Sequence, residues 1–350
     1  MEKSYSLLFD VLRFIAAILV FIHHSEQILD AEYLSAFASF GHDAVVFFFI
    51  LSGFVIGYVV HEREKTLYLY TISRLVRIYS VAFPSLLIVL FLFILGSYLF
   101  PDYYYQYNDV NWAYTFFYSL FFMNQSNFIN LGVPTNGPYW SICYEVWYYI
   151  LFGIAFYLSG WRRGVLLVSA IFVAGIKVLV LFPIWVFGFY FYIFHKKILS
   201  NNILGYTFIA LSIIIYSVLR FYNFDDYVYT LSAELLFGNE VVANSALGYS
   251  KRFLPDYFIA ILVLMFISGL FMVSNVYFSY LLKYEGIIRK ASSHSFSIYL
   301  LHYPLLIFLS MFVKSSLLAM VITLIVVFFI SKFIENKKSS YKKLILSFRK

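Results

Sequence analysis

Apolar residues in this chain form long, nearly uninterrupted runs separated by short polar segments. Runs of roughly 18–22 apolar residues match a hydrocarbon core about 30 Å thick, because an α-helix rises 1.5 Å per residue. Strands of a membrane barrel would instead give runs of about ten residues with alternating polarity. The pattern predicts ten membrane-spanning helices, at residues 7–27, 43–61, 79–99, 139–159, 164–181, 183–195, 203–220, 254–275, 296–313 and 315–334.

The composition agrees with this pattern. Of the 350 residues, 63% are hydrophobic and only 12% are charged, whereas a soluble domain carries about 25% charged residues. We therefore predict an all-α, polytopic membrane helix bundle over residues 1–335, followed by a short basic tail at 336–350. The first span contains Asp10 and Arg13 and precedes no small-residue cleavage site, so we expect it to stay as a helix rather than leave as a signal peptide.

The distribution of Lys and Arg predicts the orientation. If the N-terminus is cytoplasmic, 19 of the 25 Lys and Arg residues fall in cytoplasmic segments and three fall outside. This bias follows the positive-inside rule and favours ten spans with both termini in the cytoplasm. The same rule explains the net charge of +7 without nucleic acid as a partner, and the basic tail is placed to contact anionic membrane lipid. The single Cys143 cannot form an internal disulfide.

Two predicted outer loops are long. The loop at 100–138 is rich in Tyr, Asn and Phe, and the loop at 221–253 carries four acidic residues. Long loops are often functional. The aromatic residues form either an interfacial belt, which is the common case, or a surface that stacks on sugar rings.

The first span contains two ionisable residues, Arg13 and His24. The eleven steps between them correspond to about 16 Å along the helix axis, so they lie near opposite ends. Each has an ordinary explanation, since an arginine can extend to the headgroups and a histidine can hydrogen-bond a neighbouring helix. The alternative is a functional path, because ionisable groups inside membrane helices are costly.

Two carboxylates are expected at the depth of His24. Asp43 opens the second span on the outer side, and a carboxylate beside an imidazole fixes its tautomer and supports a general base. Glu145 lies one to two turns into the fourth span from the same side, where a carboxylate needs a partner or a proton. We predict that His24, Asp43 and Glu145 share one layer near the outer face.

The cytoplasmic end has a cationic character. Arg74 and Arg77 lie on one helical face, and two guanidinium groups on one face suit a phosphate, although ordinary positive-inside residues look the same. His302 lies about one and a half turns into the ninth span from its cytoplasmic end, where a histidine satisfied in the core is the common case. With Arg13, these residues predict a basic cytoplasmic mouth for a phosphorylated donor that reaches an outer acceptor.

At these residues the chain resembles the acyltransferase-3 family of integral membrane O-acyltransferases, over nearly its whole length. LLFDVLRFIAAILVFIHH is similar to the family's opening helix, with its Arg-x10-His pattern at Arg13 and His24. Ser80 stands where the family commonly has Pro. The further matching segments are GHDAVVFFFILSGFVIGY with Asp43, ISRLVRIYS with Arg74 and Arg77, YWSICYEVWYYI with Glu145, and SFSIYLLHYPLL with His302.

The resemblance implies transfer of an acyl group, most often acetyl from acetyl-CoA, to a hydroxyl of a cell-envelope or lipid-linked glycan. It implies a multi-pass protein of the cytoplasmic (inner) membrane that resembles the stand-alone members without a fused extracytoplasmic domain. We expect acyl-CoA as a substrate, no permanently bound cofactor and no metal site. The sequence leaves the oligomeric state, the acceptor sugar and the acyl group open.

On this hypothesis, Arg74, Arg77 and Arg13 bind the CoA phosphates, with His302 in the same basic mouth. His24 acts as the general base on the acceptor hydroxyl, oriented by Asp43, because a hydroxyl is a weak nucleophile at neutral pH. Glu145 either holds the acceptor or tunes His24, and an acyl-His24 intermediate is an alternative route. The competing interpretation is a glycan flippase or small-solute transporter, which would bind no acetyl-CoA.

Overall fold

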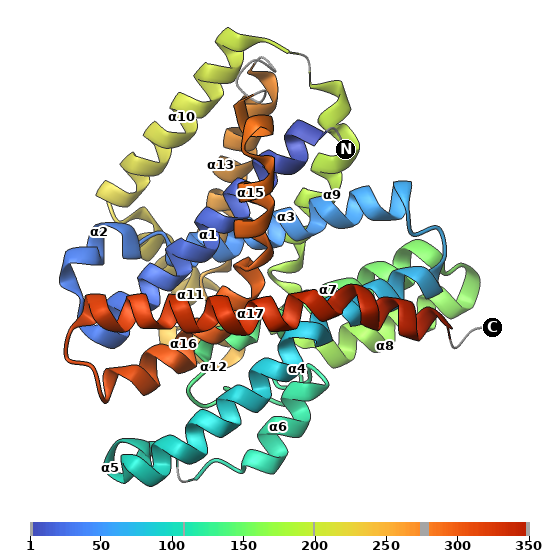
Figure 1. Cartoon of the computed structure of the whole chain (residues 1–350). Helices are drawn as coiled ribbons and strands as arrows, with labels where there is room; N and C mark the ends of the chain where they lie inside the picture. The colour runs from blue at the N-terminus through green and yellow to red at the C-terminus, as the bar shows by residue number, and fades with distance from the viewer. Residues whose placement is uncertain (1–2, 108, 199, 274–279, 348–350) are drawn as a thin grey trace.

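The computed structural model describes residues 3–107, 109–198, 200–273 and 280–347, and the side chains of these residues except residue 4 and those after Ile334. All regular secondary structure in these ranges is helical (Figure 1). The α-helices are α1 (Lys3–Leu29), α2 (Ser35–Ala38), α3 (Gly41–Glu62), α4 (Leu67–Leu99), α5 (Pro101–Tyr104), α6 (Trp112–Leu120), α7 (Trp140–Tyr157), α8 (Gly160–Leu179), α9 (Phe182–Phe194), α10 (Asn202–Phe221), α11 (Phe224–Phe237), α12 (Glu240–Leu247), α13 (Phe253–Met272), α15 (Glu285–Ser293), α16 (Ser295–Ser310) and α17 (Ser316–Ser347).

A helix lies at each of the ten predicted spans. The largest difference is α4, which begins at Leu67 instead of residue 79, because Thr66 caps its first turn through a hydrogen bond from the Leu69 amide. The predicted end of the eighth span, 274–275, lies outside the described residues. The predicted boundary at 335/336 falls inside α17, which continues to Ser347.

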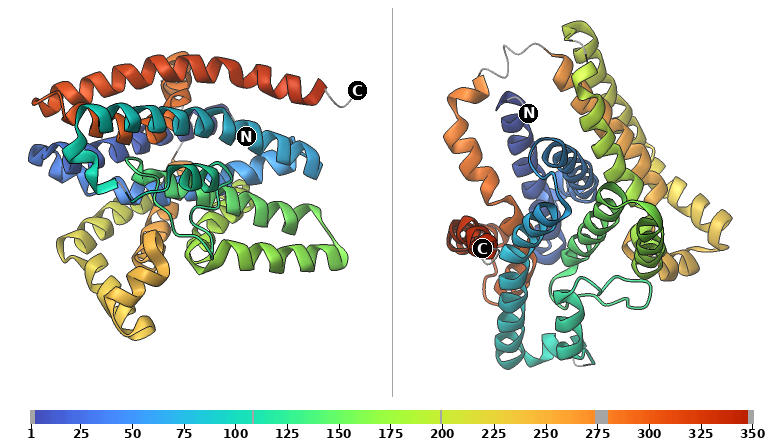
Figure 2. Two further views of the ribbon diagram at one scale, coloured as in Figure 1. Left: turned by 90° about the horizontal axis from the view of Figure 1, so that it is seen from below. Right: turned by 90° about the vertical axis from the view of Figure 1, so that its right-hand side faces the viewer.

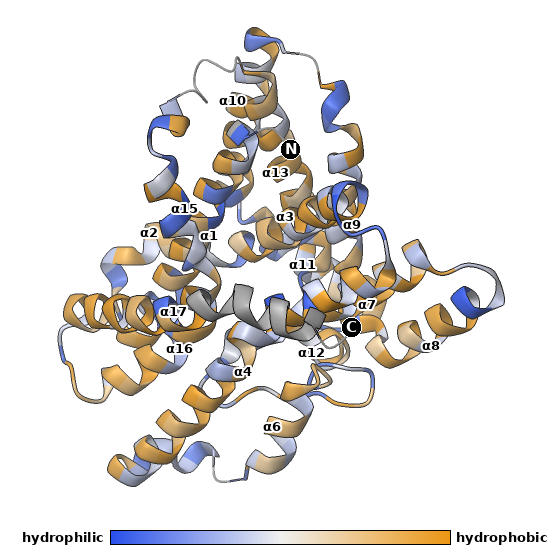
Figure 3. Ribbon diagram, turned by 45° about the vertical axis from the view of Figure 1, so that its right-hand side comes forward, coloured by the Kyte–Doolittle hydropathy of each residue, from blue (hydrophilic) through white to orange (hydrophobic). Residues whose placement is uncertain are grey.

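The helices suit a bilayer by length and composition. Among the described residues, seven helical segments are long and apolar enough to cross a membrane: Tyr5–Leu29, Glu32–Glu62, Leu67–Leu99, Ile176–Lys197, Asn202–Phe221, Phe253–Met272 and Ser316–Ile334. The apolar helix α16 is shorter, at 16 residues. Hydrophobic residues also cover the outward surfaces of α8, α10 and the first part of α17 (Figure 3). An apolar outer surface of this extent is typical of helices that face lipid.

Helix α3 is at the centre of the bundle and packs against α1 and α9. The contact with α9 depends on two glycines that let the backbones touch. A Cβ atom added at Gly53 would lie 1.9 Å from the Trp185 carbonyl oxygen, and one at Gly188 would lie 1.9 Å from the Ile50 carbonyl oxygen. Small residues permit this kind of close approach between membrane helices.

The remaining helices surround this centre as two flanks. Helix α16 packs against α1, α4 and α17, and α10 packs along α13. Both views in Figure 2 place α17 and the pair α11–α12 on opposite sides of the molecule.

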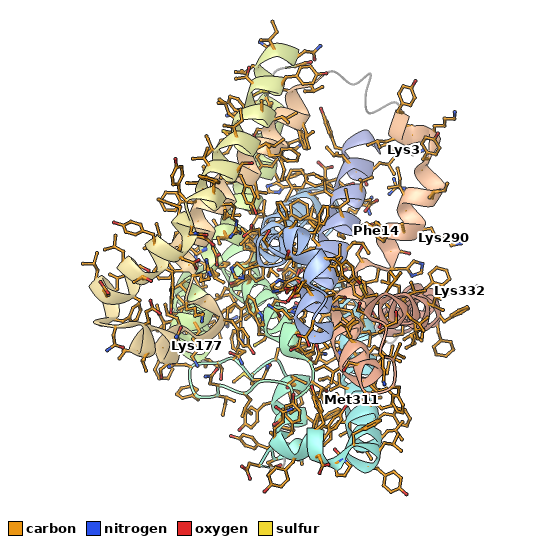
Figure 4. All side chains as sticks on the ribbon, turned by 90° about the vertical axis from the view of Figure 1, so that its left-hand side faces the viewer. Lys3, Phe14, Lys177, Lys290, Met311 and Lys332 are labelled. Carbon is orange, nitrogen blue, oxygen red and sulfur yellow. The ribbon has the colours of Figure 1, made fainter. Side chains whose placement is uncertain are left out.

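The ends of the helices alternate between two sides of the molecule. In Figure 1 the start of α1, the turn between α3 and α4, the turn between α7 and α8, and the end of α17 lie toward the right. Helix α2 and the turn between α16 and α17 lie toward the left. Helix α15 lies beside α1 near its start, where Lys3 pairs with Glu285 at 2.6 Å, and Figure 4 shows Lys3 and Lys290 on this side of the bundle.

The α3–α9 contact gives a direct test of the packing. We expect Gly188→Ala to destabilise the folded protein by about 1–3 kcal/mol, because backbone atoms cannot move aside as a side chain can. Gly164→Ala is the matched control, since nothing lies within 4 Å of a Cβ atom at that position. Equilibrium unfolding of the purified protein in detergent would measure both changes, and equal stability of the two variants would contradict the close packing.

Candidate functional site

A large cationic cavity lies between the start of α1, the end of α3, the start of α4 and α15. Its volume is about 780 Å³. Five arginines line it, and two carboxylates, those of Asp10 and Glu64, lie among them. The arginines are Arg13, Arg63, Arg74, Arg77 and Arg289. Guanidinium groups bind phosphate oxygens through paired, charge-assisted hydrogen bonds, so a cavity of this size and composition suits a ligand with several phosphates.

Asp10 holds two of these arginines in place. It lies 3.1 Å from Arg13 and 3.3 Å from Arg289, and it accepts a hydrogen bond from Ser292 at 3.1 Å. Arg289 also pairs with Glu285 at 2.9 Å. Hydrogen bonds from Lys3 and Arg289 lower the pKa of Glu285, so this carboxylate stays ionised and helps to keep α15 beside α1.

Arg74 is the most buried of the five arginines, with 8% of its surface exposed. One nitrogen, Nη2, donates to Glu64 Oε1 at 3.0 Å. Its Nε and Nη1 atoms are buried and have no hydrogen-bond partner. Because a buried charged donor without a partner is costly, these two atoms favour an anionic ligand at the wall of the cavity.

A smaller cavity of about 70 Å³ continues from this one toward the middle of the bundle. Arg13, Arg77 and Phe296 line both cavities, and Glu145 lines the smaller one. Glu145 accepts hydrogen bonds from Ser52 at 2.6 Å and from Tyr149. The two cavities therefore connect the arginine cluster to Glu145.

His24 lies at the other end of α1, next to two aromatic side chains of α16. Its ring stacks on His302 with centroids 5.3 Å apart and meets the Tyr303 ring edge-on at 4.9 Å. The Nδ1 atom of His302 contacts the Ile298 carbonyl oxygen at 2.8 Å, which requires a proton on Nδ1. Its Nε2 atom is then an acceptor, and it is buried without a partner. His24 Nδ1 lies 3.4 Å from Gln27 Oε1, which favours the same tautomer and leaves Nε2 as the basic nitrogen.

The predicted pairing of Asp43 with His24 is wrong. Asp43 forms an ion pair with Arg220 and accepts a hydrogen bond from Tyr216 at 2.6 Å. Arg220 also pairs with Asp225 at 2.6 Å. A buried carboxylate is stabilised more by a guanidinium than by a neutral imidazole, and the end of α10 brings that guanidinium to Asp43.

Two further placements differ from the sequence analysis. His302 does not line the arginine cavity, because it lies seven residues into α16, about 10 Å along the axis, where α1 presents His24. Glu145 is not in a layer with His24 and Asp43. Its hydrogen-bond partner Ser52 lies near the middle of α3, and Glu145 lines the same inner cavity as Arg13 and Arg77. Arg13, Arg74 and Arg77 do line one cavity, as expected.

Several residues of the site were not recognised in the sequence. Arg63 and Arg289 line the cationic cavity but look like ordinary positive-inside residues. Arg220 could have been found, because it ends the seventh predicted span on the side where Asp43 opens the second. Among the described residues, no group of three or more His, Cys, Asp and Glu side chains could hold a metal ion.

The comparison with known families agrees with this arrangement. The model of the acyltransferase-3 family, which describes an acyltransferase domain, matches residues 7–336. No curated protein and no solved structure matches the chain. The match covers nearly all of the helix bundle, including the arginine cavity, Glu145 and the His24–His302 pair. The chain therefore belongs to the acyltransferase-3 family and is an integral membrane acyltransferase.

Proposed function

We propose that the protein transfers an acyl group, most simply acetyl, from acyl-CoA in the cytoplasm to a hydroxyl of a cell-envelope or lipid-linked glycan. The observation that carries this proposal is the arginine-lined cavity of about 780 Å³, which continues through Arg13 and Arg77 toward the core of the bundle. A carrier for a neutral solute would have no use for five arginines around one cavity.

The donor binds with its phosphates among the arginines. Arg63 and Arg289 supply charge in the wider cavity, and Arg77 supplies it where the inner cavity begins. The unpartnered nitrogens of Arg74 supply two buried donors. The pantetheine arm, on the order of 15–20 Å long, matches the distance of about 16 Å from Arg13 to His24 along α1. The thioester carbonyl would then lie near the histidine end.

His24 is the general base in this mechanism. Its Nε2 atom takes the proton of the acceptor hydroxyl, and the hydroxyl oxygen attacks the thioester carbonyl. The carbon–sulfur bond breaks, the acyl ester forms, and the CoA thiolate leaves and takes up a proton. Stacking on His302 and contact with Tyr303 limit the rotation of the His24 ring, as the transfer geometry requires. Transfer through an acyl-His24 intermediate uses the same residues and differs by its ping-pong kinetics.

The proposed topology is ten spans with both termini in the cytoplasm, in the cytoplasmic membrane. The positive-inside count supports it, and the start of α1 and the end of α17 lie on the same side of the bundle (Figure 1). This orientation puts the arginine cavity on the side where CoA thioesters are made and His24 on the side of the envelope.

Transfer of label from acetyl-CoA tests the proposed reaction. Membrane vesicles supplied with radiolabelled acetyl-CoA are expected to incorporate label into glycan or lipid-linked sugar. His24→Ala should reduce this incorporation at least 100-fold at matched protein levels, because general-base catalysis contributes roughly 10²–10⁴-fold. His23→Ala is the control. Equal incorporation by wild type and His24→Ala would remove His24 from the mechanism, and failure to bind acetyl-CoA would favour a transporter.

The arginine cavity predicts a specific dependence on the CoA phosphates. Arg63→Gln and Arg77→Gln should each weaken acetyl-CoA binding about tenfold or more, because a charge-assisted hydrogen bond contributes about 1.5–3 kcal/mol. Binding of acetyl-pantetheine, which has no phosphate, should not change. Calorimetry on the purified protein would measure both ligands.

Arg162→Gln is the matched control for these variants. Arg162 lies in the first turn of α8, where its guanidinium contacts the Trp161 ring and lines none of the cavities described here. Equal loss of acetyl-CoA and acetyl-pantetheine binding in the cavity variants would contradict a phosphate site.

A further inference from the structure

A third cavity lies on the histidine side of the molecule, away from the arginine cluster. Its volume is about 610 Å³, within the range of about 300–1,000 Å³ that small-molecule sites occupy. The loop before α7 contributes Gln125 and Asn130, and the segment between α12 and α13 contributes Tyr249 and Arg252. Among the described residues that line it, none is acidic.

Gln125 gives this cavity a built polar group. The side chain is 1% exposed, and its Nε2 atom donates to the Leu131 carbonyl oxygen at 2.8 Å. Its Oε1 atom is buried and has no partner. A buried amide oxygen without a donor costs about 1–3 kcal/mol, so a ligand hydroxyl at this position would be favoured. Asn130 and Asn244 add two more amides to the lining.

An aromatic pair forms another part of the wall. Trp140, the first residue of α7, and Tyr249 stack in parallel with ring centroids 5.1 Å apart and an angle of 4° between their planes. Tyr249 remains 38% exposed. The negative face of an aromatic ring attracts the C–H groups of an apolar or amphipathic ligand. Amides beside a flat aromatic surface are the groups that bind a pyranose, through its hydroxyls and its C–H face respectively.

One side chain, that of Tyr303, lies near both His24 and the segment that leads into the cavity. Tyr303 meets the His24 ring edge-on at 4.9 Å. A Cβ atom at Gly137, three residues before Trp140, would lie 3.6 Å from the Tyr303 ring. Tyr303 therefore touches the His24 ring and lies beside the turn that leads into Trp140.

Asp43 holds one wall of the cavity through a chain of ion pairs. Asp43 pairs with Arg220, Arg220 with Asp225, and Asp225 with Arg252. Arg252 lines the cavity, and so does His42, which lies 2.8 Å from Asp256. These contacts join α3, α10, α11 and α13, and Arg252 lies three residues after Tyr249, so the ion pairs anchor the segment that carries Tyr249.

We propose that this cavity is the acceptor subsite, in which the Trp140–Tyr249 pair and the Gln125 amide bind a pyranose of the acceptor saccharide. The proposal rests on the proposed acyl transfer, since it supplies the hydroxyl that His24 deprotonates. It separates the two substrates: the CoA thioester binds at the arginine end of α1, and the saccharide binds at the histidine end.

Saturation-transfer NMR tests the subsite on the purified full-length protein in lipid nanodiscs. The probes are the methyl glycosides of glucose, N-acetylglucosamine and glucuronic acid at millimolar concentration. We expect at least one to receive saturation at its ring protons from the wild type. Tyr249→Ala and Gln125→Leu should each weaken this binding tenfold or more, and Tyr249→Phe should restore it, because the aromatic face is kept.

Tyr222→Ala is the matched control, because Tyr222 is 73% exposed and lines none of the cavities described here. Acetyl-CoA binding, measured in parallel by calorimetry, should be the same in all these proteins. Absence of glycoside binding by the wild type, or unchanged binding by both Tyr249→Ala and Gln125→Leu, would overturn the subsite while leaving the donor site intact. Loss of acetyl-CoA binding by the wild type would instead contradict the proposed function.

Discussion

The need to pair buried charges controls how the polar residues of this bundle are arranged. An apolar environment makes an isolated ion very costly, so charges inside it occur with counter-charges or hydrogen-bond partners. Asp10 lies between Arg13 and Arg289, Glu64 holds Arg74, and Asp43 holds Arg220. Asp10 and Arg13 lie one turn apart in α1, but each of the other pairs joins different helices or a helix and a turn. The contacts that neutralise charge therefore also fix the relative positions of the helices.

Buried polar atoms that lack a hydrogen-bond partner are informative for the same reason. Arg74 keeps two buried nitrogens without partners, Gln125 keeps one buried oxygen, and His302 keeps one buried nitrogen. The Arg74 nitrogens lie on the side of the bundle with the arginine cavity. The Gln125 oxygen and the His302 nitrogen lie on the side of His24. The molecule thus has one end where five arginines suit phosphates and another where amides and aromatic rings, beside Lys251 and Arg252, suit hydroxyl groups.

Close backbone packing allows this polar interior to exist in a membrane helix bundle. Gly53 and Gly188 bring α3 and α9 into backbone contact. Just before Gly53, Ser52 contacts Glu145, Tyr149 and the Trp185 indole, at 3.1 Å for the last. The carboxylate of Glu145 is thus held by hydroxyl groups in a narrow space, while the wider cavities lie on the arginine side and the histidine side of the bundle.

The sequence by itself determined the class of the molecule, the position of nearly every long helix and the family. Those features depend on local quantities: the length of apolar runs, the positions of ionisable residues along them and short motifs. The sequence also predicted correctly that Arg13, Arg74 and Arg77 lie together, because all three lie near the ends of spans on the same predicted side of the membrane.

Only the tertiary structure decided which side chains meet. Depth along a helix places a residue in a layer but leaves its direction around the axis, and the choice of neighbouring helix, undetermined. For that reason Asp43 and His24, at similar expected depths, have different partners, and His302 pairs with His24 rather than with the arginines. The aromatic and amide lining of the third cavity joins residues more than 100 positions apart, and no local pattern in the chain could have brought them together.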